Sequence, residues 1–453
     1  MVHPFSGRVQ VMAHGSGFPS QSTGPKQDQP YTLVEKGVVA AGTFLGMAVG
    51  TVGKEGAGSM LGGALGFTLA SKAVDYYKTY TAKGTPLYLK QGWATPVTAS
   101  NPREAMAKLL DMPEQQGERL REGNFSKVQK FMFREGEPFV IKWAKDSDYS
   151  RGASKDRDIR EWFGLEKGEV NGLRLNQHPQ LIKTHALLIQ DSRDGHYVLI
   201  NDAEQIKAET RPNYRVKAVI NEFVDGLDLR HAPGGVPEEN IESILDVLFS
   251  SDQAIKLGLP VCEALEYLHR NGVVYRDLKP ENIMIRRHDH EVKVVDLGFS
   301  KKLPPADRTS TICGTPEYMA PEVIRGEKPY GFESDAWSLG ILLLEMSTGV
   351  TPNHLSIETD KIVEASDSQH EQYQRVINFA AADNEAKRHF LWDHFPDTFF
   401  DNEKLLNLIV KLTDSDPEKR LKIEEACQQL KAMRQTLKSQ ERLDWVFSKL
   451  RLY

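Results

Sequence analysis

One short loop of the sequence concentrates side chains that could do acid–base and metal chemistry. The stretch VVYRDLKPENIMIRR places Asp277, Lys279 and Asn282 between two apolar runs. A carboxylate can accept a proton, a lysine can neutralise a phosphate, and carboxylate and amide oxygens suit Mg²⁺. A further carboxylate, Asp296, follows the short apolar strand that VKVVD predicts. This loop is either a working catalytic device or a relic in a binding protein.

The loop Tyr275–Asn282 resembles the catalytic loop of eukaryotic-type (Hanks-type) Ser/Thr protein kinases, with tyrosine where histidine is usual. The resemblance implies that Asp277 accepts the proton of an attacking hydroxyl and that Asn282, five residues later, holds Mg²⁺. Lys279 would steady the transferring phosphate, and lysine at this place is typical of Ser/Thr-specific rather than Tyr-specific kinases. Asp296, in Asp-Leu-Gly, matches the metal-binding DFG triplet with leucine replacing phenylalanine.

The segment TICGTPEYMAPE is similar to the end of the activation loop in the same family. Within it, Thr315 is expected beside the catalytic aspartate and lysine. The resemblance also implies that Glu322 forms a buried ion pair with Arg420. Asp335 begins the following helix and would brace the catalytic loop.

Thr311 is the expected activating phosphorylation site in this segment. A phosphate there would dock on Arg276, beside the catalytic aspartate, and order the loop. Thr309 and Ser310 are neighbouring alternatives, and an unmodified exposed threonine is the other reading.

The strand pattern EPFVIKWA supplies Lys142, which matches the lysine that grips the α- and β-phosphates of ATP. In many kinases the helix glutamate that pairs with this lysine lies about ten residues before a His-Pro pair. His178-Pro179 is present, so we select Glu169 as the partner, with Glu166 as a weaker alternative.

The glycine-rich loop is the poorest match to the family. LREGNFSKV retains only the central glycine, Gly123, where a side chain would keep the backbone from approaching a phosphate. The other nucleotide contacts implied by the resemblance are Val128 and Val140 above the adenine, Met284 below it, backbone groups of Glu222 and Val224 at the hinge, and Asn221 guarding the back pocket.

These parts occur in family order over most of the chain, so the predicted fold is α+β, the bilobal protein-kinase fold. We expect a kinase domain over residues 114–435, with a β-rich N-lobe over 114–224 and a helical C-lobe over 225–435. The strand patterns precede the helical ones along the chain, as that division requires. Residues 436–453 would form a C-terminal tail.

Two segments of different composition precede this domain. Residues 1–34 are polar and read as a disordered leader. Residues 35–80 form a glycine-rich, apolar, glycine-zipper-like extension, with glycines recurring every four residues in two helical segments. Residues 37–74 are compatible with a hairpin in a membrane, and a helical pair packed on protein is the alternative.

The bulk composition excludes several classes of protein. The 453 residues carry 57 basic and 63 acidic side chains, a net charge of -6, which does not call for a nucleic-acid partner. The three cysteines are scattered and without CxxC spacing, which argues against a disulfide framework or a structural zinc site. A reducing compartment, cytoplasmic or membrane-associated, is the simplest expectation, and the leader and glycine-rich pair also resemble those of effector kinases that bacteria inject into host cells.

The predicted function is transfer of the γ-phosphoryl group of ATP, with Mg²⁺, to Ser or Thr hydroxyls of a protein substrate. The alternative is a pseudokinase scaffold that binds partners without turnover. The reduced glycine loop, the Asp-Leu-Gly triplet and Asn221 favour the scaffold, whereas the retained Lys142, Asp277 and Asp296 favour the enzyme.

Overall fold

The chain divides into two compact units, residues 1–84 and 85–453, and every residue described below belongs to the second. The structure is a computed structural model that describes residues 96–110, 117–122, 126–132, 138–144, 168–175, 177–191, 194–202, 214–230, 250–304, 306–326 and 329–437. The predicted leader over residues 1–34, the glycine-rich pair over 35–80, Gly123, Glu166 and nearly all of the predicted tail lie outside these residues.

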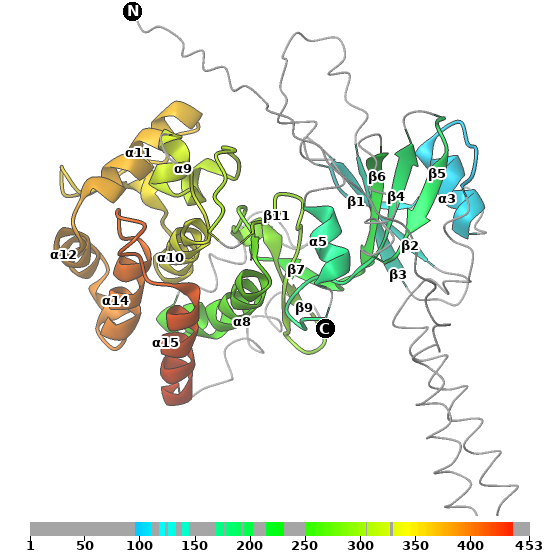
Figure 1. Cartoon of the computed structure of the whole chain (residues 1–453). Helices are drawn as coiled ribbons and strands as arrows, with labels where there is room; N and C mark the ends of the chain where they lie inside the picture. The colour runs from blue at the N-terminus through cyan, green and yellow to red at the C-terminus, as the bar shows by residue number, and fades with distance from the viewer. Residues whose placement is uncertain are drawn as a thin grey trace, which may run out of the picture. The chain divides into compact units, whose positions relative to one another are not determined.

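A six-stranded antiparallel sheet forms the first half of the described unit, with the strand order β1-β2-β3-β6-β4-β5 (Figure 1). Its strands are β1 Glu118–Glu122, β2 Ser126–Met132, β3 Pro138–Ala144, β4 Thr184–Asp191, β5 Tyr197–Ile200 and β6 Tyr214–Glu222. The strand predictions for this half of the chain are confirmed. One short helix, α5 Glu169–Arg174, precedes β4 and begins at the glutamate selected from the His178-Pro179 spacing.

The alternating pattern of β3 explains how this sheet has two different faces. Phe139, Ile141 and Trp143 are buried in one apolar cluster on the outer face. Val140 and Lys142 alternate with them and therefore point to the opposite face. One strand thus contributes a core on one side and a candidate site residue on the other.

A segment ahead of the predicted domain boundary also belongs to this core. Helix α3, Pro102–Leu110, buries Ala105 and Met106 in the outer-face cluster. Figure 1 shows it beside β5, and Val97 just before it forms a β-bridge with Tyr197 of that strand. The predicted domain began at residue 114, and this helix was not predicted.

Short strands and helices make up the rest of the described chain. The strands are β7 Gly226–Asp228, β8 Val273–Val274, β9 Ile283–Arg286, β10 Val292–Val294, β11 Lys301–Lys302, β12 Leu355–Ser356 and β13 Lys361–Ile362. The α-helices are α8 Ser251–Arg270, α9 Pro321–Arg325, α10 Glu333–Thr348, α11 Gln369–Ala381, α12 Asn384–His394, α13 Pro396–Phe399, α14 Glu403–Leu412 and α15 Ile423–Thr436, and the 3₁₀ turns are η2 Pro280–Asn282, η3 Pro316–Tyr318 and η4 Pro352–His354. The predominance of helix after residue 225 was predicted and is confirmed.

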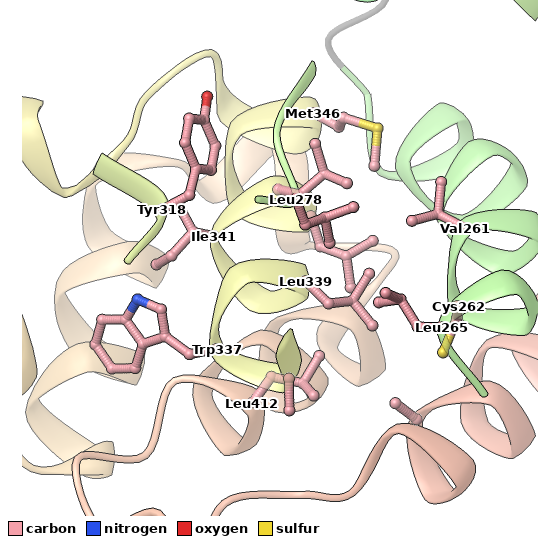
Figure 2. Packing of buried hydrophobic residues seen from close by; sticks show 14 of the residues in the cluster. Val261, Cys262, Leu265, Leu278, Tyr318, Trp337, Leu339, Ile341, Met346 and Leu412 are labelled. Carbon is pink, nitrogen blue, oxygen red and sulfur yellow. The ribbon is translucent and has the colours of Figure 1, made fainter. Parts of the chain in front are cut away.

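Helix α10 lies at the centre of the helical core. Nearly all of its residues are buried, because apolar side chains occupy every side of it rather than one stripe. Figure 2 shows Leu339 and Met346 of α10 near Val261 and Leu265 of α8. Trp337, fully buried, packs edge-on against Phe379. This core gives the loops above it a rigid base.

Two strand pairings bring the candidate loops together. The loop of residues 275–282 runs from β8 to β9, and the segment of residues 295–300 runs from β10 to β11. Because β9 pairs with β10 and β8 pairs with β11, the two loops are held side by side at both ends. Across the described part of the chain, no helix is both long and apolar enough to cross a membrane.

Candidate active site

Lys142 lies between two carboxylates that come from different parts of the chain. Its Nζ donates to Glu169 Oε1 at 2.9 Å and to Asp296 Oδ1 at 2.5 Å. Lys142 is on β3, Glu169 begins α5, and Asp296 follows β10. The ion pair between Lys142 and Glu169 that the His-Pro spacing predicted is present in the structure.

Helix α5 is held in place from the segment after Asp296. The backbone N–H of Gly168 donates to the Ser300 carbonyl at 2.9 Å, and the Asn171 side-chain amide donates to the Ser300 hydroxyl at 3.0 Å. A Cβ at Gly168 would lie only 2.0 Å from the Gly298 carbonyl oxygen, so these two backbone segments approach more closely than a side chain allows. These contacts fix the position of α5, and so of the Glu169 carboxylate relative to Lys142.

Asp277 is buried and is surrounded by three polar side chains. The Asn282 amide donates to its Oδ2 at 2.9 Å and to its backbone carbonyl at 2.8 Å. Lys279 Nζ lies 3.1 Å from Oδ2, and the Thr315 hydroxyl donates to Oδ1 at 3.0 Å. Lys279 Nζ also donates to Thr315 Oγ1 at 2.7 Å. The structure therefore brings Thr315 beside Asp277 and Lys279, as the sequence predicted.

Asp335 supports the loop from below. It is fully buried at the start of α10, and its carboxylate accepts the backbone N–H groups of Tyr275 and Arg276, each at 2.8 Å. The ring of His269 makes a further contact with it at 2.7 Å. Arg276 has a φ of 74°, a backbone conformation that costs a non-glycine residue about 1–3 kcal/mol. The two hydrogen bonds to Asp335 hold that conformation in place.

Burial and neighbouring charges set the protonation of the site. Burial raises the pKa of Asp277, and the Asp296 carboxylate adds to this effect, while Lys279 and Thr315 oppose it. Burial alone would lower the pKa of Lys142, but the carboxylates of Asp296 and Glu169 outweigh burial and raise it. Burial would also raise the pKa of Asp296, yet the adjacent ammonium group lowers it. Asp296 is therefore held ionised beside a permanently charged lysine.

The donor atoms near Asp296 fit a hard divalent cation. Mg²⁺ binds oxygen ligands and is commonly held by one or two carboxylates together with substrate phosphates. The Lys142 ammonium already lies 2.5 Å from Asp296 Oδ1, so a cation is accommodated against this carboxylate. The Val295 N–H donates to the Asn282 carbonyl at 2.9 Å, which keeps the two candidate ligands close together at the ends of the paired strands β9 and β10. Asn282 uses its amide nitrogen on Asp277, which leaves the amide oxygen to face a metal.

The nucleotide-contact candidates are distributed over β2, β3, β6 and β9. Val128 pairs directly with Lys142 across β2 and β3, and Val140 is two residues from Lys142, so all three share one face of the sheet. Val224 is buried just after β6, and Met284 on β9 is partly buried against the helical core. Their contact with adenine stays a prediction.

One ionic contact at the end of β6 was not predicted. Glu222 Oε1 accepts a hydrogen bond from Lys293 Nζ at 3.0 Å and from the Lys183 backbone N–H at 2.8 Å. Lys293 lies on β10, so Glu222, a predicted hinge residue, is tied to the strand that leads to Asp296. A lysine within the otherwise apolar VKVVD was the available signal, because buried lysines are almost always paired.

The activation segment is anchored at its far end. Both Glu322 carboxylate oxygens accept hydrogen bonds from the buried Arg420 guanidinium, at 2.7 and 2.9 Å. The predicted ion pair is therefore present. It is bidentate, the geometry that a planar guanidinium favours.

The three candidate hydroxyls of this segment have different environments. Thr309 is buried and accepts a hydrogen bond from Lys301 Nζ at 3.0 Å. Ser310 is exposed and Thr311 is partly exposed. Among the described residues, Nη1 of Arg276 is buried without a hydrogen-bond partner, while its Nε donates to the Phe299 carbonyl at 2.6 Å.

Comparison with known proteins matches most of the chain to one family. Residues 115–430 match the family model described as protein kinase domain. The putative serine/threonine-protein kinase PRKY of Homo sapiens is 52% identical over 104 residues, which cover 23% of this chain and 36% of that protein. The cAMP-dependent protein kinase type 3 of Saccharomyces cerevisiae is 53% identical over 92 residues, 20% of this chain and 22% of that protein.

A longer alignment joins the chain to a RAC family serine/threonine-protein kinase homolog of Dictyostelium discoideum. It is 37% identical over 180 residues, which cover 39% of this chain and 34% of that protein. The chain thus aligns with about a third or less of the length of these curated relatives.

Proposed function

Because this chain belongs to the protein kinase family, we propose that it transfers the γ-phosphoryl group of ATP to Ser or Thr hydroxyls of a protein substrate. The observation that carries the proposal is the pair of charged clusters around Lys142 and Asp277. Asp296 of the first cluster and Asp277 of the second lie on two loops that paired strands hold together. Phosphoryl transfer depends on positioning and charge neutralisation, and these clusters supply both.

Lys142 holds the α- and β-phosphates of ATP in the proposed mechanism. Its ammonium group is charged at all physiological pH values, because the two adjacent carboxylates raise its pKa. Glu169 keeps the lysine on the correct side of β3, since its carboxylate is 2.9 Å from Nζ. When ATP binds, the phosphates replace part of the Asp296 contact with Lys142.

Asp296 and Asn282 would hold Mg²⁺. The metal would supply charge neutralisation of the β- and γ-phosphates. Asp296 is ready for this role because its neighbouring lysine lowers its pKa and keeps it ionised. Asn282 is oriented for it by the hydrogen bonds of its amide nitrogen to Asp277.

Asp277 orients the substrate hydroxyl and accepts its proton. Burial raises its pKa, which makes the carboxylate a stronger base than an exposed aspartate. Lys279 is close enough to Asp277, 3.1 Å, to stabilise the γ-phosphate at the same position. Thr315 ties this lysine and the aspartate to the activation segment, so the order of that segment controls the geometry of the base.

A protein hydroxyl is the proposed acceptor for two reasons. Lys279 occupies the place that is typical of Ser/Thr-specific kinases, and two of the relatives named above, those from Homo sapiens and Dictyostelium discoideum, are named as serine/threonine-protein kinases. GTPEYMAPE favours a protein over a lipid or sugar, because this segment forms the docking surface for a peptide chain in the family.

Thr311 is the proposed activating phosphorylation site. Its partial exposure contrasts with the burial of Thr309, which is already bound to Lys301. Nη1 of Arg276 has no hydrogen-bond partner, and a phosphate could accept a hydrogen bond from it. Mass spectrometry of the autophosphorylated protein should find phosphate on Thr311, and phosphate on Ser310 alone would contradict this choice.

The test of the proposed function is a transfer assay with the full chain, Mg²⁺ and ATP, using a generic basic acceptor protein. We expect phosphate on Ser or Thr of the acceptor, and Lys142→Met should lower the rate by about two orders of magnitude or more, since one positioned charge is lost from the transition state. Lys411→Met, an exposed lysine on α14, is the matched control and should retain the rate. Nucleotide binding without transfer, even after Thr311 is phosphorylated in trans, would instead favour the scaffold.

A further inference from the structure

Residues 97–110, which we call the N-terminal strap, fold onto the sheet ahead of the region that matches the family model. That region begins at residue 115, so the strap is an addition to it. Its first contact is a β-bridge, in which the backbone groups of Val97 and Tyr197 exchange two hydrogen bonds of 2.9 Å. Since β5 is the last strand of the sheet, this bridge covers an otherwise open edge.

The helix of the strap has its own start signals. Asn101 caps it, because its side-chain oxygen accepts the Glu104 N–H at 2.9 Å, and Pro102 occupies the first helical position. The Glu104 carboxylate in turn accepts the Ser100 N–H at 2.8 Å. Lys108 closes the loop by donating to the Thr98 carbonyl at 2.9 Å. The strap is thus a locally specified structure rather than a loose end.

The strap packs on the outer face of the sheet through two kinds of contact. Ala105 and Met106 are 0% and 4% exposed, within the cluster that contains Phe139, Ile141 and Trp143 of β3. Above them the Arg103 guanidinium lies 5.4 Å from the centre of the Trp143 ring. Figure 1 shows α3 on the side of the sheet where β4 and β5 lie.

A polar contact fixes the strap to a second strand. Arg103 Nη2 donates to Gln129 Oε1 at 2.9 Å, and the Gln129 amide donates to the Gly117 carbonyl at 2.9 Å. Gln129 is buried on β2, opposite Ile141 of β3. Arg103 therefore contacts both Gln129 of β2 and the indole ring of Trp143 on β3.

We propose that the N-terminal strap is a positioning element of the nucleotide site, with Arg103 as a positioning residue that acts on Lys142 through Trp143 and β3. The proposal rests on the phosphoryl-transfer function proposed above. Trp143 and Lys142 are successive residues on opposite faces of β3, so any shift of the strand moves both. Lys142 must meet Glu169 and Asp296 within 2.9 Å, which leaves little tolerance for such a shift.

The expected loss of MgATP affinity on replacing Arg103 follows from how little the strand β3 can shift. A displacement of about 1 Å in a catalytic group can reduce a rate by about 100-fold. Loss of one hydrogen bond and one cation–π contact is a smaller perturbation, and we expect about a three- to tenfold weakening of MgATP binding. Arg103 is partly exposed and lies on the face of β3 opposite Lys142, so its replacement by methionine removes the contacts with Trp143 and Gln129 without placing a charge in the core.

The experiment compares three variants of the full chain: Arg103→Met, Arg103→Lys and Arg388→Met. Arg388 is the matched control, since it is also partly exposed and donates to a side-chain oxygen of Asn407, as well as to Glu403, but it lies on α12 in the helical half of the described chain. The measurements are the Kd for MgATP by calorimetry, KM for ATP and kcat, and hydrogen exchange of the β3 amides.

The proposal predicts a raised Kd and KM for ATP in Arg103→Met with a smaller change in kcat, partial recovery in Arg103→Lys, and faster exchange in β3. Arg388→Met should stay within about twofold of wild type. An Arg103→Met protein that is less heat-stable but binds MgATP as wild type does would overturn the proposal, because the strap would then be only structural. A wild type that binds MgATP without transferring phosphate would refute the proposed function alone, and the Kd comparison would still decide the role of the strap.

Discussion

Lys387 is a fully buried lysine in the helical core, far in sequence from the catalytic loops. Its Nζ donates to the Thr413 carbonyl at 2.6 Å and lies 5.8 Å from the Trp337 ring centre and 5.2 Å from that of Phe379. Burial lowers the pKa of Lys387 from 10.5 to about 8, because nearby carboxylates only partly offset the loss of water. We therefore expect the stability of this core to depend on pH in the alkaline range.

The sign and size of that dependence follow from the two pKa values. Between pH 8 and pH 10.5 the unfolded chain holds a proton that folded Lys387 has released, so stability rises with pH across this window. Each tenfold difference in proton affinity is worth about 1.4 kcal/mol, so the full gain from Lys387 is about 3 kcal/mol. Below pH 8 the lysine is charged in both states and contributes no pH dependence.

Urea unfolding followed by circular dichroism, from pH 7.5 to 10.5, measures this gain. The free energy of unfolding of wild type should rise relative to that of Lys387→Met by up to about 3 kcal/mol over the window. Lys411→Met, on the surface of α14, should keep the wild-type slope and so controls for the replacement of an exposed lysine by methionine. Equal slopes for wild type and Lys387→Met would refute the assignment of this pKa to burial.

Two further predictions concern the catalytic base and the anchor of the activation segment. Thr315→Val removes a hydrogen bond that lowers the pKa of Asp277. The acidic limb of the kcat–pH profile should therefore move to higher pH. A limb that stays in place or moves to lower pH would contradict the contact. Arg420→Met leaves Glu322 without its buried partner and should lower the free energy of unfolding, measured in urea, by about 3–5 kcal/mol. Arg420→Lys should recover part of this loss. A loss below about 1 kcal/mol would mean that water replaces the ion pair.

The sequence predicted a strand-rich region followed by a helical one, and the main contacts of the candidate site. It could do so where a short motif carries both the residue and its neighbours. Asp277, Lys279 and Asn282 lie within six residues, so their spacing in one loop nearly determines how they meet. The pairing of Lys142 with Glu169 spans a longer stretch and was predicted only through the spacing to His178-Pro179.

The strap and the hinge ion pair were missed for a physical reason. Both depend on partners that are distant in the chain, so a local signal can mark one residue of the contact but not its partner. Arg103 and Gln129 are brought together by the fold, and Glu222 at the end of β6 meets Lys293 of β10 although the two strands belong to different sheets. The helix α3 itself does have a local signal, because NPREAMAKLL combines an Asn-Pro start with apolar residues at helical spacing.

The most direct test of the proposed catalysis is a comparison of Asp277→Asn with wild type for both turnover and MgATP binding. Asparagine keeps the shape, and its single oxygen can still accept the Asn282 amide, but it loses the second acceptor oxygen that Thr315 uses and it accepts no proton. We expect a kcat at least about 100-fold lower with the Kd for MgATP within a fewfold of wild type, while Asp397→Asn on the surface keeps full activity. A turnover in Asp277→Asn equal to that of wild type would show that Asp277 is not the base, and the proposed mechanism would fail.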